Sequence, residues 1–140
     1  MVIERRKDVI GRTIQVDLPK LGFIGIPAKV DTGAYFCSLH CHQIEVRVIE
    51  GKNVLCFKLL DPSHPEYKEK EIRFRNFSVK KIKSSVGEIE ERYTIRTAIR
   101  IHKRRIKTFV TLANRGSMRY PMLIGRRLLK NKFIVDVSLK

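Results

Sequence analysis

Apolar and polar residues alternate along most of this chain, and this two-residue period constrains the fold more than any other feature. In residues 93–101, Ile95 and Ile99 fall on one face of a strand, whereas Arg96 and Arg100 fall on the other. Successive side chains of a strand point to opposite faces, so one face can enter a core while the other meets solvent. The pattern predicts a chain built mainly from β-strands.

Turn signals divide the chain into short segments. A Pro-Lys-Leu-Gly turn at residues 19–22 predicts a hairpin, and a second turn contains Gly51. Residues 126–130 are the one segment with helical character. The predicted strands are residues 13–18, 23–30, 44–49, 54–60, 72–79, 93–101, 106–112 and 133–137. We therefore expect an all-β fold with one short helix near its end.

Length and composition suggest one domain. The 140 residues, 43% of them hydrophobic, are enough for one core and too few for two, so we expect a single domain over residues 1–140. No apolar stretch reaches the roughly 20 residues that cross a bilayer, and residues 1–12 lack the apolar centre of a signal peptide. We expect a cytoplasmic protein without membrane contact, with Cys37, Cys41 and Cys56 as small buried thiols.

Positive charge is concentrated at the C-terminal end of the chain. Residues 92–140 contain 14 Lys and Arg against one Asp, a net charge of +13, whereas residues 1–91 carry +3. Such a field attracts nucleic acid, an anionic surface or an acidic peptide. The charge narrows the class of partner and does not bear on the fold.

A single Asp-Thr-Gly-Ala sequence, residues 31–34, follows an apolar run at residues 24–30. An aspartic hydrolase needs two carboxylates around one water, so a chain with one such motif would need the second carboxylate from another copy of itself. The structural alternative for Asp31 is a solvated turn residue or a helix cap.

This motif has a partner block, Pro-Met-Leu-Ile-Gly-Arg-Arg-Leu-Leu at residues 121–129, and the two together resemble the retropepsin-like aspartic proteases. Residues 28–34, the Ser-Leu-His at 38–40 and the ending at 133–138 are similar to the bacterial and archaeal branch often labelled "ATP-dependent zinc protease". The resemblance covers about residues 10–138 and implies a closed-barrel, homodimeric protomer. No nucleotide-binding glycine loop accompanies it.

The resemblance also implies roles for individual residues. Asp31 would be catalytic, and the two Asp31 carboxylates of a dimer would share one proton. Residues expected to support the catalytic loop are Thr32, Gly33 and Ala34, and those expected to give structural support near the site are His40, Gly125, Arg126, Leu128 and Leu129. A hairpin from within residues 55–79 could close over substrate, or could be only a surface excursion.

Histidines and cysteines near the motif raise the question of a metal. His40 and His42 are weak candidate ligands because they share a strand face, with His64 or His102 as a third. Cys37 and Cys41 would stand about 13 Å apart on a strand, too far to share one zinc. We expect no metal and no other cofactor.

Two functions follow from these observations. The first, which the resemblance implies, is an aspartic peptidase that processes acidic or polyglutamate tails, because members of that family are associated with ATP-grasp ligases that add glutamates. Arg96, Arg100 and Arg126 could pair with substrate carboxylates. The alternative is a basic β-barrel that binds RNA or the ribosome without catalysis. Against the alternative, the Phe and Tyr residues form no evident stacking platform.

Overall fold

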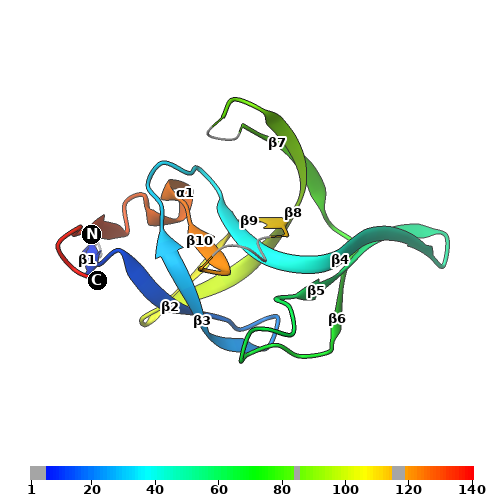
Figure 1. Ribbon diagram of the computed structural model, residues 1–140, viewed down its shortest axis with the longest axis horizontal. Coiled ribbons are helices and arrows are strands. Elements are labelled where there is room, and N and C mark those ends of the chain that lie inside the picture. Colours follow the sequence, from blue (N-terminus) through cyan, green and yellow to red (C-terminus); the bar gives the residue numbers. More distant parts are fainter. Residues whose placement is uncertain (1–5, 84–85, 115–118) are drawn as a thin grey trace, which may run out of the picture.

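The computed structural model describes residues 6–83, 86–114 and 119–140, and these form eleven strands and one short helix (Figure 1). In chain order the elements are β1 (Asp8–Ile10), β2 (Thr13–Leu18), β3 (Phe23–Val30), β4 (Cys37–Ile49), β5 (Lys52–Leu59), β6 (Glu71–Phe74), β7 (Ser78–Lys83), β8 (Ile89–Ile101), β9 (Arg104–Ala113), β10 (Met122–Ile124), α1 (Arg126–Leu129) and β11 (Phe133–Val135). The predicted all-β fold with one short helix near its end is confirmed.

Six strands close into a barrel in the order β10-β3-β2-β8-β9-β4. Strand β10 completes the closure because it pairs on one side with β3, where Met122 faces Ala28, and on the other with β4, where Met122 faces Leu39. The predicted hairpin of β2 and β3 forms one part of the wall. Closure leaves no unpaired strand edge within the barrel wall.

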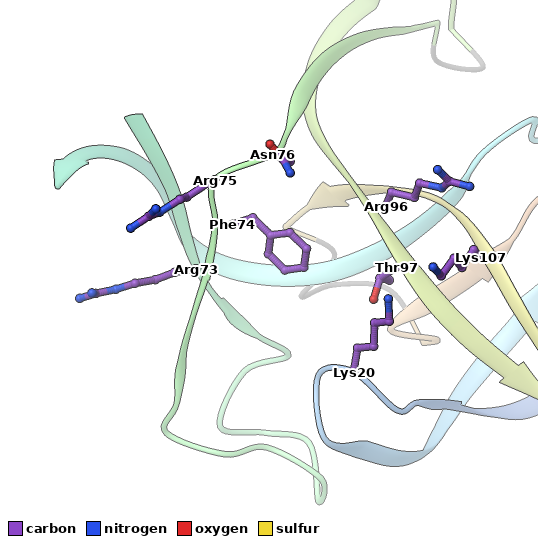
Figure 2. Close-up of a pocket in the computed structure, with 8 residues that line it drawn as sticks. All are labelled: Lys20, Arg73, Phe74, Arg75, Asn76, Arg96, Thr97 and Lys107. Atoms are coloured by element: carbon purple, nitrogen blue, oxygen red, sulfur yellow. The ribbon is translucent and has the colours of Figure 1, made fainter. Parts of the chain in front are cut away.

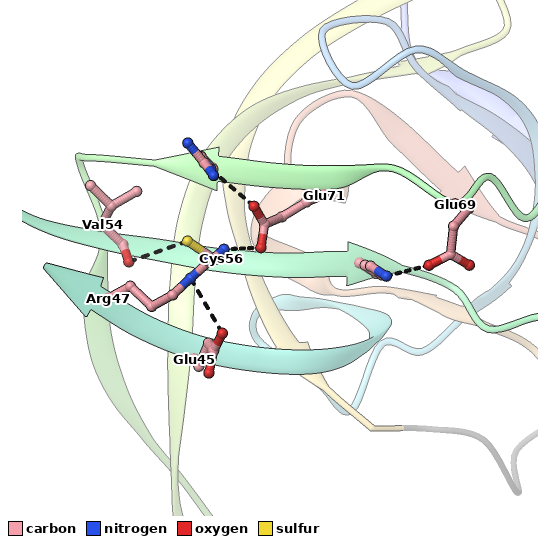
Figure 3. Close-up of polar contacts among 8 residues, drawn as sticks. Glu45, Arg47, Val54, Cys56, Glu69 and Glu71 are labelled. Carbon is pink, nitrogen blue, oxygen red and sulfur yellow. Dashed lines mark hydrogen bonds and ion pairs between the residues drawn. The ribbon is translucent and has the colours of Figure 1, made fainter. Parts of the chain in front are cut away.

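Strand β4 continues past the barrel and pairs with β5, which in turn pairs with β6. Ion pairs cover this extension (Figure 3): Glu71 contacts both Arg47 and Arg73, and Lys58 contacts Glu69. Exposed pairs of this kind contribute only about 0–1 kcal/mol each. Their main consequence is that acidic side chains of this part of the chain are neutralised by their own neighbours.

Strands β7 and β8 form a hairpin that rises from the barrel and curves toward the side where α1 lies (Figure 1). Its register runs from Ser78 opposite Thr94 to Lys83 opposite Ile89. Residues 72–79 were predicted as one strand, and this prediction is wrong. The chain leaves its partner β5 at Phe74 and joins β8 from Ser78, so a bend separates two strands with different partners.

The two ends of the described chain lie side by side, because β1 and β11 pair in parallel as a separate two-stranded sheet (Figure 1). Val9 faces Ile134 in this register, and the two side chains are 53% and 52% exposed. An apolar pair therefore stands on the surface next to α1.

The core follows the two-residue pattern of the sequence. Ile95 and Ile99 of β8 are buried, whereas Arg96 and Arg100 between and beside them are exposed, as predicted. All three cysteines are free and buried, which also agrees with the prediction. Among the described residues no helix has the length and apolar character needed to cross a bilayer.

Candidate active site

Asp31 opens a tight loop where β3 ends, at the rim of the barrel. Its backbone N–H donates to the carbonyl oxygen of Ile124 in β10 (2.9 Å). Its Oδ1 accepts from the Gly33 N–H (3.0 Å), and its carbonyl oxygen accepts from the Ala34 N–H (3.2 Å). These three hydrogen bonds hold a partly exposed carboxylate at the end of a strand that is anchored in the core.

Helix α1 supports the far side of this loop. The N–H groups of Arg126 and Arg127 donate to the carbonyl oxygens of Ala34 (2.8 Å) and Tyr35 (3.0 Å), so backbone donors at the start of the helix are satisfied by the loop. A Cβ on Gly125 would lie 2.5 Å from the carbonyl oxygen of Phe36, which explains why glycine occupies this position. The helix is fixed in turn by Leu128 and Leu129, which are buried in the core.

The Arg126 side chain lies along the outside of the loop. Its Nη1 donates to the carbonyl oxygens of Gly33 (3.1 Å) and Thr32 (3.4 Å), and its guanidinium lies 5.4 Å from the centre of the Tyr35 ring. Arg126 therefore positions the loop, and it also brings a positive charge to its edge. Thr32 itself is exposed.

A cavity of about 630 Å³ lies between the Asp31 loop and β7. Asp31, Gly33 and Arg126 line one side, and Lys81 and Lys83 of β7 line the other. The sequence reasoning missed both lysines, although their alternation in residues 78–83 places them on one face of a strand. Two ammonium groups thus share the cavity with the carboxylate.

The strand that borders this cavity is β7. For residues 55–79 the sequence left open a hairpin over the substrate or a surface excursion. In the structure β5 and β6 belong to the extended sheet beyond the barrel, and β7 with the start of β8 forms the projecting hairpin. Strand β7 takes β8 as its partner, and local alternation in the sequence does not specify this pairing.

Three arginines were predicted to pair with substrate carboxylates, and the structure does not bring them together. Only Arg126 lines the cavity of Asp31. Arg96 lines a different pocket, and the Nη1 of Arg100 lies 4.0 Å from Oδ2 of Asp17. They diverge because β8 carries Arg96 and Arg100 along the barrel wall while Arg126 belongs to the helix below the loop.

His40 faces a loop other than that of Asp31. It is 1% exposed, and its Nε2 lies 2.5 Å from Oδ2 of Asp61. Asp61 also accepts hydrogen bonds from the hydroxyl and the N–H of Ser63. The bond from the Ser63 hydroxyl, then the bond to His40, then the bond from the Ser63 N–H hold the pKa of Asp61 well below its usual range. The hydrogen bond between His40 and Asp61 connects β4 to the loop that follows β5.

The candidate metal ligands His40 and His42 turn to different partners. Nδ1 of His42 lies 2.6 Å from the carbonyl oxygen of Leu60, whereas His40 groups with Asp61 and His64, whose ligand atoms lie within 4.8 Å of one another. Tetrahedral zinc with ligands at about 2.0–2.1 Å keeps two ligand atoms about 3.3 Å apart. The shorter His40–Asp61 distance fits a hydrogen-bonded pair and does not fit two ligands of one zinc.

Asp61→Asn should lower the free energy of unfolding by about 1–3 kcal/mol near pH 7, because it removes a charged acceptor from a buried imidazole. The pKa of Asp61 is lowered on folding, so its ionised form stabilises the fold above the usual value of 3.8, and this contribution is lost as the pH falls below that value. Urea unfolding of wild type and variant should therefore give a difference that shrinks toward about pH 3. The exposed Glu50→Gln serves as control, and a pH-independent difference for Asp61→Asn would contradict the assignment.

The cysteine closest to the loop in sequence is not suited to nucleophilic catalysis. Cys37 is 1% exposed, and burial raises the pKa of its thiol to about 11. The pKa of Cys41 is also raised by burial. Because the thiolate is the reactive form, neither thiol is activated at neutral pH. Among the described residues that line the cavity, Asp31 is the only one with a carboxylate.

A closed barrel with an Asp-Thr-Gly loop on a short helix belongs to the retropepsin-like class. More narrowly, the chain belongs to the RimB-like family, whose model is described as "Retropepsin-like aspartic endopeptidase RimB" and matches residues 9–140. The resemblance inferred from the Asp31 and Gly125 blocks is thus confirmed.

Curated relatives and a solved structure add to this finding. The chain is 38% identical over 136 residues to a protein of Shewanella halifaxensis named "Probable alpha-L-glutamate ligase", and 31% identical over 138 residues to a protein of the same name from Desulfotalea psychrophila. These matches cover 94% and 96% of the chain but only 29% of either relative. The fold is similar, at a TM-score of 0.73 and 24% identity over 96% of this chain and 97% of the other, to the crystal structure of Lpg0085, a protein of unknown function (DUF785) from Legionella pneumophila.

Proposed function

We propose that this protein is an aspartic peptidase in which Asp31 and its counterpart from a second copy activate a water molecule. The observation that carries the proposal is the Asp31 loop itself, with its carboxylate fixed by the Gly33 N–H and directed at a cavity of about 630 Å³. The family to which the chain belongs supports the same reading.

The chemistry needs two carboxylates with different tasks. Like charges a few ångström apart cannot both ionise, so the pair shares one proton. The ionised carboxylate takes a proton from the water as the water oxygen attacks the scissile carbonyl carbon, and the protonated carboxyl donates to the carbonyl oxygen. The tetrahedral intermediate then collapses as the leaving nitrogen receives a proton, and no covalent enzyme intermediate forms.

The second copy would bind where the Asp31 loop and the chain termini meet. A groove of about 600 Å³ is lined by Thr32 and Tyr35 of the loop and by Phe133 and Val135 of β11. The exposed apolar pair of β1 and β11 lies on the same small sheet. A partner that covers this sheet about a two-fold axis would also reach the loop, so dimerisation and assembly of the site would be one event.

The substrate we propose is an acidic peptide, such as a polyglutamate tail. Lys81, Lys83 and Arg126 surround the cavity of Asp31 and can pair with glutamate carboxylates on either side of the scissile bond. The name "Probable alpha-L-glutamate ligase" of the relatives supports a link to glutamate chemistry. A ligase that adds glutamates and a peptidase that removes them act on the same tail.

Incubation with a polyglutamate-tailed protein and its untailed twin tests this function. We expect the tailed protein alone to be shortened, with glutamate-containing fragments detected by mass spectrometry, because only the tail brings carboxylates to Lys81 and Lys83. The double variant Lys81→Gln/Lys83→Gln should raise KM for the tailed protein with little change in kcat. Equal cleavage of both proteins would contradict the substrate, and cleavage of neither at any pH would contradict the peptidase.

A further inference from the structure

A second polar pocket, of about 410 Å³, lies on the barrel away from the Asp31 loop (Figure 2). It is bordered by the turn after β2, the link from β6 to β7, the middle of β8 and one residue of β9; its lining residues are Lys20, Arg73, Phe74, Arg75, Asn76, Arg96, Thr97 and Lys107. The two cavities share no lining residue, so this pocket is a separate site. Five of the eight residues are basic and none is acidic.

The basic residues differ in where they point. Arg73 contacts Glu71, and Figure 2 shows Arg73 and Arg75 directed away from the centre of the pocket. Lys20 and Lys107 instead extend toward each other. Lys20 is exposed, and the charge of Lys107, ahead of desolvation and the charge of Arg105, lowers the pKa of Lys20. Two close ammonium groups without a carboxylate among the lining residues repel each other, and a bound anion would relieve that repulsion.

Thr97 gives an independent indication of a ligand. It is 1% exposed, and its hydroxyl oxygen has no hydrogen-bond partner among the described residues. A buried hydroxyl without a hydrogen-bond partner is destabilising, because it has lost its bonds to water. In Figure 2 the hydroxyl is drawn on the side of the Lys20 ammonium group, and both residues line the pocket. A ligand oxygen placed there would accept its hydrogen bond.

Phe74 supplies a flat apolar surface in the same pocket. Its ring is partly buried and stacks on Phe57, with ring centroids 6.1 Å apart and an interplanar angle of 24°. An aromatic ring held in this way can bind the face of a nucleobase by stacking. The pocket thus combines anion-binding groups with a ring-binding surface.

We propose that this pocket binds a nucleotide through its phosphate monoester, either as a free nucleotide or as the 5′ end of an RNA strand. The phosphate lies between Lys20 and Lys107 and accepts a hydrogen bond from Thr97, Arg96 adds charge at the rim, and the base lies over Phe74. A phosphate monoester carries a charge of about −1.5 to −2 near pH 7, which matches two neighbouring ammonium groups better than the single charge of a carboxylate. A glutamate side chain also has no ring to place on Phe74.

Isothermal titration calorimetry with AMP, adenosine and inorganic phosphate tests the site on the intact protein. We expect AMP to bind at least about tenfold more tightly than adenosine, because the phosphate contacts contribute most of the affinity. Lys20→Gln/Lys107→Gln should weaken AMP binding at least about tenfold, and Thr97→Val about threefold. The matched control Lys52→Gln/Lys103→Gln removes two exposed charges elsewhere and should leave AMP affinity within about twofold.

The same titration with RNA oligonucleotides distinguishes the two sources of the phosphate. Tighter binding of a 5′-phosphorylated strand than of AMP would indicate an RNA end, and tighter binding of AMP would indicate a free nucleotide. Three results would overturn the proposal: equal losses in the two double-lysine variants, equal affinity for AMP and adenosine, or a hexaglutamate peptide that binds more tightly than AMP and loses this affinity in Lys20→Gln/Lys107→Gln. Thermal unfolding of each variant confirms that the loss is not one of folding.

Discussion

Asp31→Asn should abolish peptide-bond hydrolysis, with a loss of about 10³-fold or more in kcat/KM. An amide can still accept the hydrogen bond from the Gly33 N–H, so the loop should keep its shape. The amide cannot take a proton from water or share one with its counterpart, so both halves of the acid–base chemistry fail. Cleavage of an acidic peptide by purified wild type and variant, with thermal unfolding measured in parallel, gives the comparison.

Asp17→Asn is the matched control for this substitution. Oδ1 of Asp17 accepts a hydrogen bond from the Gly25 N–H (2.9 Å), as Oδ1 of Asp31 does from Gly33, but Asp17 lies in β2 and does not line the cavity. It should retain wild-type activity. Full activity in Asp31→Asn would remove the aspartic mechanism and leave the motif as a structural turn.

Mixing Asp31→Asn with wild type tests whether each copy supplies half of the site. If the active species is a dimer with one Asp31 from each copy, heterodimers are inactive and activity falls with the square of the wild-type fraction. An equal mixture after subunit exchange should retain about a quarter of the activity of the same total amount of wild type. Retention of half at equilibrium, together with sedimentation as a monomer, would show that a single copy is sufficient.

Gly125→Ala should disrupt the contact between helix α1 and the loop that carries Asp31. The new Cβ would lie 2.5 Å from the carbonyl oxygen of Phe36 and 2.7 Å from that of Tyr35, and both are backbone atoms that cannot turn aside. Either the loop or the helix must move, which breaks the hydrogen bonds from Arg126 and Arg127 to the loop. We expect a loss of about 1–3 kcal/mol in the free energy of unfolding and a loss of about 10²-fold in kcat/KM.

Gly22→Ala is the matched control, because it should also lower the stability of the fold but lies away from the Asp31 loop. Gly22 has φ +78, so alanine there is strained by about 1 kcal/mol, and the nearest atom to its Cβ is the Lys70 Nζ at 4.0 Å. Urea unfolding should show that both variants are less stable, while peptidase assays should show that only Gly125→Ala is impaired. Equal activities in the two folded variants would contradict the supporting role of Gly125.

Much of the fold was predictable because strand periodicity is a local property. Ile95 and Ile99 were placed in the core, and Arg96 and Arg100 at the surface, from alternation alone. The break between β6 and β7 was missed because a strand that changes partner keeps the same alternation on both sides of the bend. Closure of the barrel by β10 depends on pairings with two distant strands.

The residues of the candidate site were also predictable only in part. Asp31 and Gly125 were recognised because the two short blocks that contain them together resemble the retropepsin-like proteases. Lys81 and Lys83 were missed because a lysine on an exposed strand face carries no signal of what lies opposite. The unsatisfied Thr97 hydroxyl could not be predicted either, because whether a polar atom finds a hydrogen-bond partner depends on the residues that surround it in the fold.

The sequence by itself therefore determined the strand content, the short helix, and the presence of a single Asp-Thr-Gly carboxylate in each copy. Only the tertiary structure decided which cations meet that carboxylate, that His40 pairs with Asp61, and that Arg96 lies at a second pocket. The physical reason is that periodicity reports the face on which a side chain stands, whereas its neighbours across space depend on strand pairing and barrel closure between residues far apart in the chain.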